Sequence, residues 1–194
     1  MKKSSKPEIY LALLHYPVVN KRGKVIASAV TNLDLHDMAR AARTYGVQAF
    51  YVVTPLTDQK ELVEQIAAHW TAGVGGTINP ARKNALNLIR IKDTMEEVVS
   101  EIESFGSGKP GVVVTSARKS EESVGFPFMR EKLRDGAPHV LCFGTAWGLT
   151  DEFIAEADYL LDPVMGNSDY NHLSVRSAAS IILDRLVGRT EDEL

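Results

Sequence analysis

The sequence predicts an α/β fold in which one mainly parallel sheet carries helices on both faces. Short apolar runs alternate with stretches of helical period along the whole chain, and this alternation is typical of parallel sheets. The 194 residues suit one domain with a core of its own. We find no repeat, low-complexity tract or linker that divides the chain, so we expect a single domain over residues 1–194.

Each expected element follows from its hydrophobic pattern. The expected strands are residues 9–14, 48–54, 88–91, 111–114, 139–143 and 158–162. The expected helices are residues 35–45, 57–71, 95–104, 128–134, a short one after residue 149 and one from about 173 to 187. Thr31 and Asp34 belong to a polar cluster able to cap the first helix, and Gly46 is placed to end it. The inward stripe of the last helix comprises Val175, Ala178, Ala179, Ile182, Leu183 and Leu186.

Two stretches are expected to be less regular. A basic loop at residues 20–24 separates the first strand from an apolar run at residues 25–30. Residues 72–87 contain several glycines and Pro80, which disfavour regular structure. Loops of that length in a compact domain are usually functional or mobile.

Composition restricts the classes of function. The net charge of −3 argues against a protein whose whole surface binds nucleic acid, but a local basic patch can still bind RNA. Candidate patches lie at residues 21–24, 82–92 and 118–119, and each is also an ordinary solvated cluster. No apolar run approaches the ~20 residues that span a bilayer, and we expect a cytoplasmic protein with no membrane contact. Cys142 is the single cysteine and the histidines lack metal-ligand spacing, so no metal site is expected.

Two loops that follow predicted strands are the candidate ligand site. Residues 144–149 follow one strand and residues 163–172 follow the next, and ligands of α/β sheets bind at such strand ends. Gly144 and Gly148 leave space for a ligand to approach main-chain groups. Because neither loop carries a lysine to grip phosphate, a flat and largely neutral adenine nucleoside suits them better than a triphosphate.

These loops also carry a family resemblance. The runs FGTAWGL (residues 143–149) and LDPVMGNSDYNHLSVRSAASIIL (residues 161–183) resemble the last two motifs of the SPOUT methyltransferases. These enzymes use S-adenosylmethionine (SAM), have a C-terminal trefoil knot and usually modify RNA, and the chain is most similar to their small stand-alone bacterial group. The resemblance implies a knot within about residues 111–187 and a homodimer that pairs through it. It also implies that the cofactor site is lined by Thr115, Ser116, Gly144, Thr145, Gly148, Leu149, Val164, Gly166, Leu173 and Ser174.

The first helix resembles another motif of that family. There, an Asn-led loop precedes a helix whose arginine contacts RNA phosphate or assists the acceptor, and Asn32 and Arg40 are the matching positions. Arg43 is a possible neighbour in the substrate site. Exposed arginines on a helix are also common without any function, and the resemblance is what favours a catalytic and substrate-binding role for Arg40.

Asp169 is the second catalytic candidate. It is followed three residues later by His172, which resembles the bacterial tRNA guanine-N1 methyltransferases, where such an aspartate is the general base. The alternative is that Asp169, Asn171 and Ser168 cap the last helix. Both interpretations remain open at this stage.

The chain departs from the family pattern at two places. Ala146-Trp147 stands where many relatives have an acidic residue, and His172 to Ser174 stands where ribose 2′-O methyltransferases often have Asn. The resemblance as a whole still leads us to expect a SAM-dependent enzyme that methylates a nucleotide of tRNA or rRNA. The alternatives are a non-catalytic RNA- or ribosome-associated protein with the same fold, and an unrelated flavodoxin-like nucleotide binder.

Overall fold

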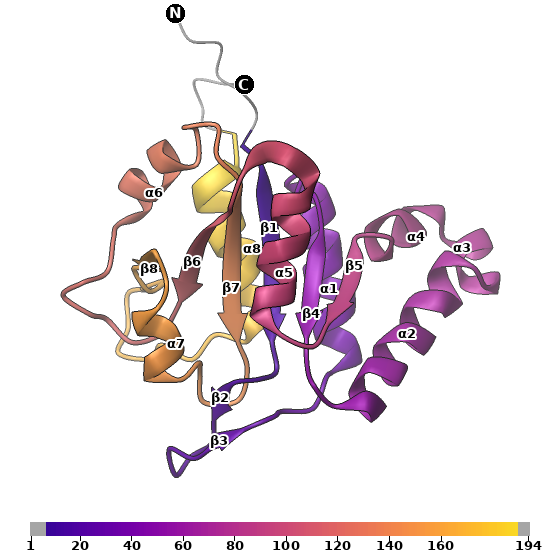
Figure 1. The fold of residues 1–194 in the computed structure, drawn as a ribbon, viewed down its shortest axis with the longest axis horizontal. Helices are drawn as coiled ribbons and strands as arrows, with labels where there is room; N and C mark the ends of the chain where they lie inside the picture. The colour runs from indigo at the N-terminus through magenta and orange to yellow at the C-terminus, as the bar shows by residue number, and fades with distance from the viewer. Residues whose placement is uncertain (1–6, 190–194) are drawn as a thin grey trace, which may run out of the picture.

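A parallel six-stranded sheet forms the centre of the molecule in the computed structural model, which describes residues 7–189 (Figure 1). The strand order is β5-β4-β1-β7-β6-β8. The strands are β1 (Ile9–Leu14), β4 (Phe50–Val53), β5 (Ile89–Lys92), β6 (Gly111–Thr115), β7 (His139–Gly144) and β8 (Tyr159–Leu161). Neighbouring strands pair in parallel, so their carboxyl ends lie at one edge of the sheet, the lower edge in Figure 1.

Helices cover both faces of the sheet because alternate side chains of each strand point to opposite sides. Leu11 and Leu13 of β1 belong to one apolar core, and Ala12 and Leu14 to the other. Helices α1, α4, α6 and α8 pack on the first core, and α5 and α7 pack on the second. The helices are α1 (Asn32–Thr44), α2 (Thr57–Thr71), α3 (Val74–Ile78), α4 (Pro80–Leu86), α5 (Met95–Ile102), α6 (Phe126–Lys132), α7 (Asp151–Ala155) and α8 (Val175–Val187). The predicted α/β class is confirmed.

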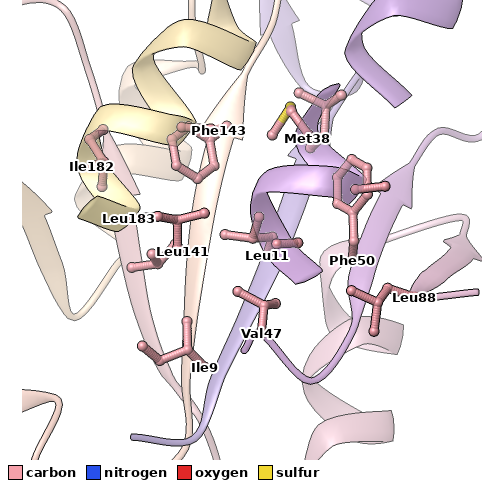
Figure 2. Packing of buried hydrophobic residues seen from close by; sticks show 14 of the residues in the cluster. Ile9, Leu11, Met38, Val47, Phe50, Leu88, Leu141, Phe143, Ile182 and Leu183 are labelled. Carbon is pink, nitrogen blue, oxygen red and sulfur yellow. The ribbon is translucent and has the colours of Figure 1, made fainter. Parts of the chain in front are cut away.

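The last helix packs as its apolar stripe predicts. Ala179, Ile182, Leu183 and Leu186 are buried, and Val175 and Ala178 pack partly buried against the same core. Figure 2 shows Ile182 and Leu183 beside Leu141 and Phe143 of β7. The helix therefore holds the C-terminal part of the chain against the centre of the sheet.

The prediction of an irregular loop at residues 72–87 is wrong, because α3 and α4 occupy most of it. Gly76 is buried against α2, and a Cβ on it would lie 2.3 Å from the carbonyl oxygen of Trp70. The Asn79 side chain accepts a hydrogen bond from the Arg82 N–H (2.9 Å) and caps α4. The glycine serves close packing between helices here, so it does not mark a break in regular structure.

The apolar run at residues 25–30 is regular only at its start. Only β3 (Val25–Ile26) is regular, and it pairs antiparallel with β2 (Val18–Val19) in a separate small hairpin. Thr31 caps α1 as expected, but the helix begins at Asn32. The hairpin lies below the carboxyl edge of the main sheet (Figure 1).

Replacing Leu183 by Ala should lower the free energy of unfolding by roughly 2–5 kcal/mol, because it removes a fully buried side chain from the core. Urea denaturation measures this loss. Leu33→Ala is the control, since Leu33 is 60% exposed on α1 and its truncation should change stability by no more than about 0.5 kcal/mol. Equal effects of the two changes would contradict the packing described for α8.

Candidate functional site

A cavity of about 880 Å³ lies at the carboxyl edge of the sheet. Its volume is in the range of sites for small molecules and cofactors. Its wall combines the two loops singled out from the sequence with the β2–β3 hairpin, the start of α1 and the start of α8. Segments far apart in the sequence therefore meet at the end of the central strands, as the parallel topology requires.

Most of the residues predicted to bind the cofactor line this one cavity. They are Thr115, Ser116, Gly144, Thr145, Gly148, Leu149, Val164, Leu173 and Ser174. Gly166 is not among the lining residues; it is exposed on the β8–α8 loop, and no atom would lie within 4 Å of an added Cβ.

The loop after β7 is shaped by close contacts within itself. A Cβ on Gly144 would lie 2.8 Å from Leu149 Cγ and 2.9 Å from Leu149 N. Gly148 has a positive φ of 107°, which favours glycine. The expectation that Gly144 leaves room for a ligand is thus corrected, because the space beside it is filled by the loop.

The loop after β8 crosses back towards the loop after β6. The Asn171 amide Nδ2 donates to the carbonyl of Ala117 (2.8 Å), and this bond joins the two loops on one side of the cavity. Ser174 is the N-cap of α8, and its side chain accepts a hydrogen bond from the Ser177 N–H (3.4 Å).

The capping interpretation of Asp169 is therefore wrong. The helix begins at Val175, six residues after Asp169, and Ser174 already supplies the cap. Asp169 lies exposed on the β8–α8 loop and is not among the residues that line the cavity. Its neighbours Asn171 and His172 do line it.

The β2–β3 hairpin forms a wall of the cavity that sequence reasoning missed. The Val19 N–H donates to the Gly148 carbonyl (2.9 Å), and the Trp147 N–H donates to the Val19 carbonyl (3.1 Å). The hairpin is thereby fixed to the loop after β7. The signal was present in the sequence, since a turn with Asn20 and Gly23 lies between two pairs of β-branched residues.

A chain of hydrogen-bonded side chains, one buried and two partly buried, lies under this wall. The Thr145 hydroxyl donates to the Leu14 carbonyl (3.1 Å) and lies 2.5 Å from the Ser28 hydroxyl, which in turn lies 2.9 Å from His15 Nδ1. His15 is 1% exposed, and burial lowers its pKa to about 4 although the nearby Asp34 carboxylate acts to raise it. His15 is therefore neutral at neutral pH.

The charges in the cavity wall are paired. Asp34 is buried, accepts from the Thr31 hydroxyl (2.6 Å) and lies 3.2 Å from Arg176 Nη1. Arg176 also pairs with Asp37 through Nε (3.3 Å). Arg118 lies 3.7 Å from Asp151. Sequence reasoning missed the contact between Asp34 and Arg176 because 142 positions separate them.

The candidate substrate residues lie on α1, away from the cavity wall. Asn32, Arg40 and Arg43 are exposed, and none of them lines the cavity. Arg40 lines a second groove between α1 and α8, together with Asp37 and Arg176. Arg176 lines both this groove and the cavity, so the two are adjacent at this residue.

The cavity suits the adenosyl ligand that the family resemblance implies. Leu149, Ile154, Val164 and Ile182 supply apolar surface for a flat base, and the remaining wall offers hydroxyl, amide and main-chain groups. The lining contains no lysine. Among residues 7–189, no group of three His, Cys, Asp or Glu side chains could hold a metal ion, and no helix of that part of the chain has the length and apolar character to span a membrane.

Replacing His15 by Asn should make stability less sensitive to acid. His15 has an ordinary pKa of 6.5 when unfolded and about 4 when folded, so below pH 6.5 the unfolded chain binds a proton that the folded chain does not. The stability present above pH 6.5 is thus lost as the pH falls towards 4, by at most about 3 kcal/mol. Denaturation of both proteins at neutral and acidic pH measures the difference, and equal losses would contradict it.

Known proteins with related sequences or folds are methyltransferases for the most part. A tRNA (guanine-N(1)-)-methyltransferase of Oleidesulfovibrio alaskensis is 44% identical over 180 residues, which are 93% of this chain and 42% of that protein. An uncharacterized protein of Aquifex aeolicus is 37% identical over 182 residues, with 93% and 89% covered. The chain thus spans less than half of the first relative and most of the second.

A solved structure shares the fold. The SpoU methyltransferase AviRb of Streptomyces viridochromogenes, crystallised with AdoMet, superposes with a TM-score of 0.58 at 16% identity and covers 94% of this chain and 58% of that one. A sequence model of SAM-dependent RNA methyltransferases matches residues 8–188. The match covers almost the whole chain, which therefore belongs to the SAM-dependent RNA methyltransferase family.

Proposed function

We propose that this chain transfers a methyl group from SAM to a nucleotide of tRNA or rRNA, with the cofactor in the cavity at the carboxyl edge of the sheet. The observation that carries this proposal is the meeting of two loops, residues 144–149 and 163–174, in one wall that has apolar surface and no unpaired cation. The family supplies the cofactor. A cytoplasmic location is part of the same proposal, because tRNA and rRNA are the proposed substrates.

A trefoil knot over about residues 111–187 within a single domain is part of the same proposal. Strand β8 lies at the sheet edge, beyond β6, yet α8 returns to pack on β7 at the centre. On the way, the β8–α8 loop binds the loop after β6 through Asn171 and Ala117. The path from the edge past an earlier loop to the centre is what supports threading of the C-terminal segment.

Binding of the cofactor falls to residues of both loops. Leu149, Val164 and Ile154 offer the apolar surface for the adenine ring, and Thr115 and Ser116 offer polar groups at the end of β6. SAM, when bound, supplies a methyl group that its positive sulfur makes electrophilic. The chain's own task is therefore to position the acceptor and to remove a proton if the acceptor is an N–H or O–H group.

Asp169 is the residue we assign to proton removal. It has no structural role as a helix cap, it is exposed, and it lies between Val164 and His172, which both line the cavity. A carboxylate in a loop at the mouth of the cavity can reach an acceptor that enters from solvent. The O. alaskensis relative carries the name of a guanine-N1 enzyme, which makes a ring nitrogen of tRNA the acceptor we favour.

Arg40 is assigned to RNA phosphate, with Asn32 and Arg43 beside it on α1. Arg40 lies in the groove between α1 and α8 and outside the cavity of its own chain. We therefore propose a homodimer that pairs through the knot region and α8. In this dimer, each site combines the cavity of one protomer with Arg40 on α1 of the other protomer.

A non-catalytic RNA-binding protein is the second candidate, and two observations favour it. Ala146-Trp147 replaces the acidic residue of many relatives, and neither Asp169 nor Arg40 lines the cavity. The two functions are separated by incubating the purified protein with labelled SAM and total RNA from a strain that lacks the protein, and measuring the label in the RNA. An enzyme methylates that RNA more than RNA from the intact strain, and a binding protein does not.

Replacing Ala178 by Phe should weaken SAM binding by roughly tenfold or more, because a larger side chain on α8 would occupy the apolar part of the cavity. Calorimetry with SAM measures the affinity. Ala81→Phe, at an exposed position of α4 outside the cavity, is the control and should leave it unchanged. Full affinity of the Ala178→Phe protein, with a normal thermal unfolding curve, would place the cofactor elsewhere.

Replacing Asp169 by Asn should reduce methyl transfer to RNA by about 10²- to 10⁴-fold, the usual contribution of a general base. SAM affinity should not change, since Asp169 lies outside the cavity wall. Single-turnover transfer to unmodified RNA at saturating SAM measures the rate. Glu64→Gln removes an exposed carboxylate from α2 and is the matched control. A rate equal to that of the unchanged protein would remove Asp169 from the mechanism.

A further inference from the structure

Trp147 stands out at the mouth of the cavity. It lines the cavity, yet 60% of the side chain is exposed, although tryptophan is usually largely buried. The preceding residue, Ala146, has a φ of 53° and is the one non-glycine residue with positive φ among residues 7–189. Such backbone is unfavourable for a residue with a side chain and tends to occur where function requires it.

The backbone that carries the indole is fixed from two sides. The Trp147 N–H donates to Val19 in the β2–β3 hairpin, and the Val19 N–H donates to Gly148 (2.9 Å). Within the loop, the Gly148 N–H donates to the Thr145 carbonyl (3.0 Å). An exposed ring on an ordered backbone can bind a flat ligand with little loss of conformational entropy.

The same hairpin, bonded to the Trp147 backbone through Val19, carries three cations in its turn. The Asn20 side-chain carbonyl accepts from the N–H groups of Arg22 (2.8 Å) and Lys24 (3.1 Å), and the Asn20 N–H donates to the Lys24 carbonyl (2.9 Å). We name residues 20–24 the basic turn. Its Lys21, Arg22 and Lys24 side chains are exposed, and none of them forms an ion pair with another residue of the described range.

The basic turn and Trp147 are thus joined through Val19, and Asn20 and Gly23 of the turn also line the cavity. Arg118, on another part of the wall, is different because Asp151 partly compensates its charge. Free cations beside an exposed aromatic ring are the combination that binds single-stranded nucleic acid, since the ring stacks on a base while the cations bind phosphate.

We propose that Trp147 and the basic turn form a binding site for an unpaired nucleotide of RNA, with the base stacked on the indole and the flanking phosphates bound by Lys21, Arg22 and Lys24. The inference rests on the proposed function in that the RNA is the methyl acceptor, but binding itself requires no methyl transfer. The site explains why Trp147 takes the place of an acidic residue. It holds RNA so that an unpaired base lies at the entrance to the cofactor cavity.

The test is the binding of a short oligoadenylate with a fluorescent label, measured by anisotropy, with quenching of tryptophan fluorescence as a second readout. Trp147→Ala should weaken binding by roughly 5- to 150-fold, the usual effect of removing one stacked base. Trp147→Phe should lose the quenching and retain most of the affinity. Trp70→Phe is the matched control, because Trp70 lies on α2 beside Arg82 of α4 and does not line the cavity. This protein should keep both the quenching and the affinity.

An abasic oligoribonucleotide of the same length separates the base from the phosphates. It should bind the unchanged protein and the Trp147→Ala protein equally, and more weakly than oligoadenylate binds the unchanged protein. The triple change Lys21→Ala, Arg22→Ala and Lys24→Ala should weaken both oligomers and reduce the slope of log affinity against log salt by up to about 2. Lys21, Arg22, Lys24 and Trp147 are exposed, so their replacement should leave the thermal unfolding temperature the same.

The outcomes distinguish this site from the proposed function. Equal affinity of the unchanged and Trp147→Ala proteins for oligoadenylate, or an abasic oligomer that binds as tightly as oligoadenylate, overturns the stacking site alone. An unchanged protein that binds no RNA overturns both proposals. Binding that depends on Trp147, in a protein that transfers no methyl group to any RNA, supports this site and refutes the methyltransferase.

Discussion

The parallel pairing of β1 with β7 is the constraint on which the candidate site depends. Its register sets Leu14 opposite Gly144, so that two chain segments leave the sheet side by side. The Thr145 hydroxyl can then bind the Leu14 carbonyl and meet Ser28. Both strands are buried on both faces, and the burial of these apolar side chains on two sides is what holds the register.

Electrostatics in the cavity wall are arranged to leave little free charge. Asp34 is compensated by Arg176, and His15 is kept neutral by burial. An unpaired charge in such a position is costly, and pairing removes the cost. The resulting wall favours a neutral base over a highly charged phosphate group, in agreement with the cofactor of the family. Cations that have no ion-pair partner within residues 7–189 lie instead on the basic turn and, as Arg40 and Arg43, on α1.

Two surfaces beside the cavity are the ones that we propose for RNA, namely the β2–β3 hairpin with Trp147 and the groove that contains Arg40. The hairpin that carries the basic turn is joined to the loop after β7 by main-chain hydrogen bonds of Val19 with Trp147 and Gly148. Arg40 and Arg176 line the same groove between α1 and α8. In the proposed arrangement, the largely apolar interior binds the cofactor, and solvated cations at its rim attract RNA phosphate over a long range.

The sequence by itself determined the α/β class, the six strands, the inward stripe of α8 and the two loops, after β7 and after β8, that meet at the cavity wall. These follow from local signals, because apolar runs, helical period and glycine-containing loops after strands are properties of neighbouring residues. Only the tertiary structure decided the rest. Gly76 packs against Trp70, Asp34 pairs with Arg176, and Val19 binds the loop of Trp147. Ser174, and not Asp169, caps α8. Contacts of this kind join positions far apart in the chain or choose between several local donors, and the packing of the whole domain is what selects them.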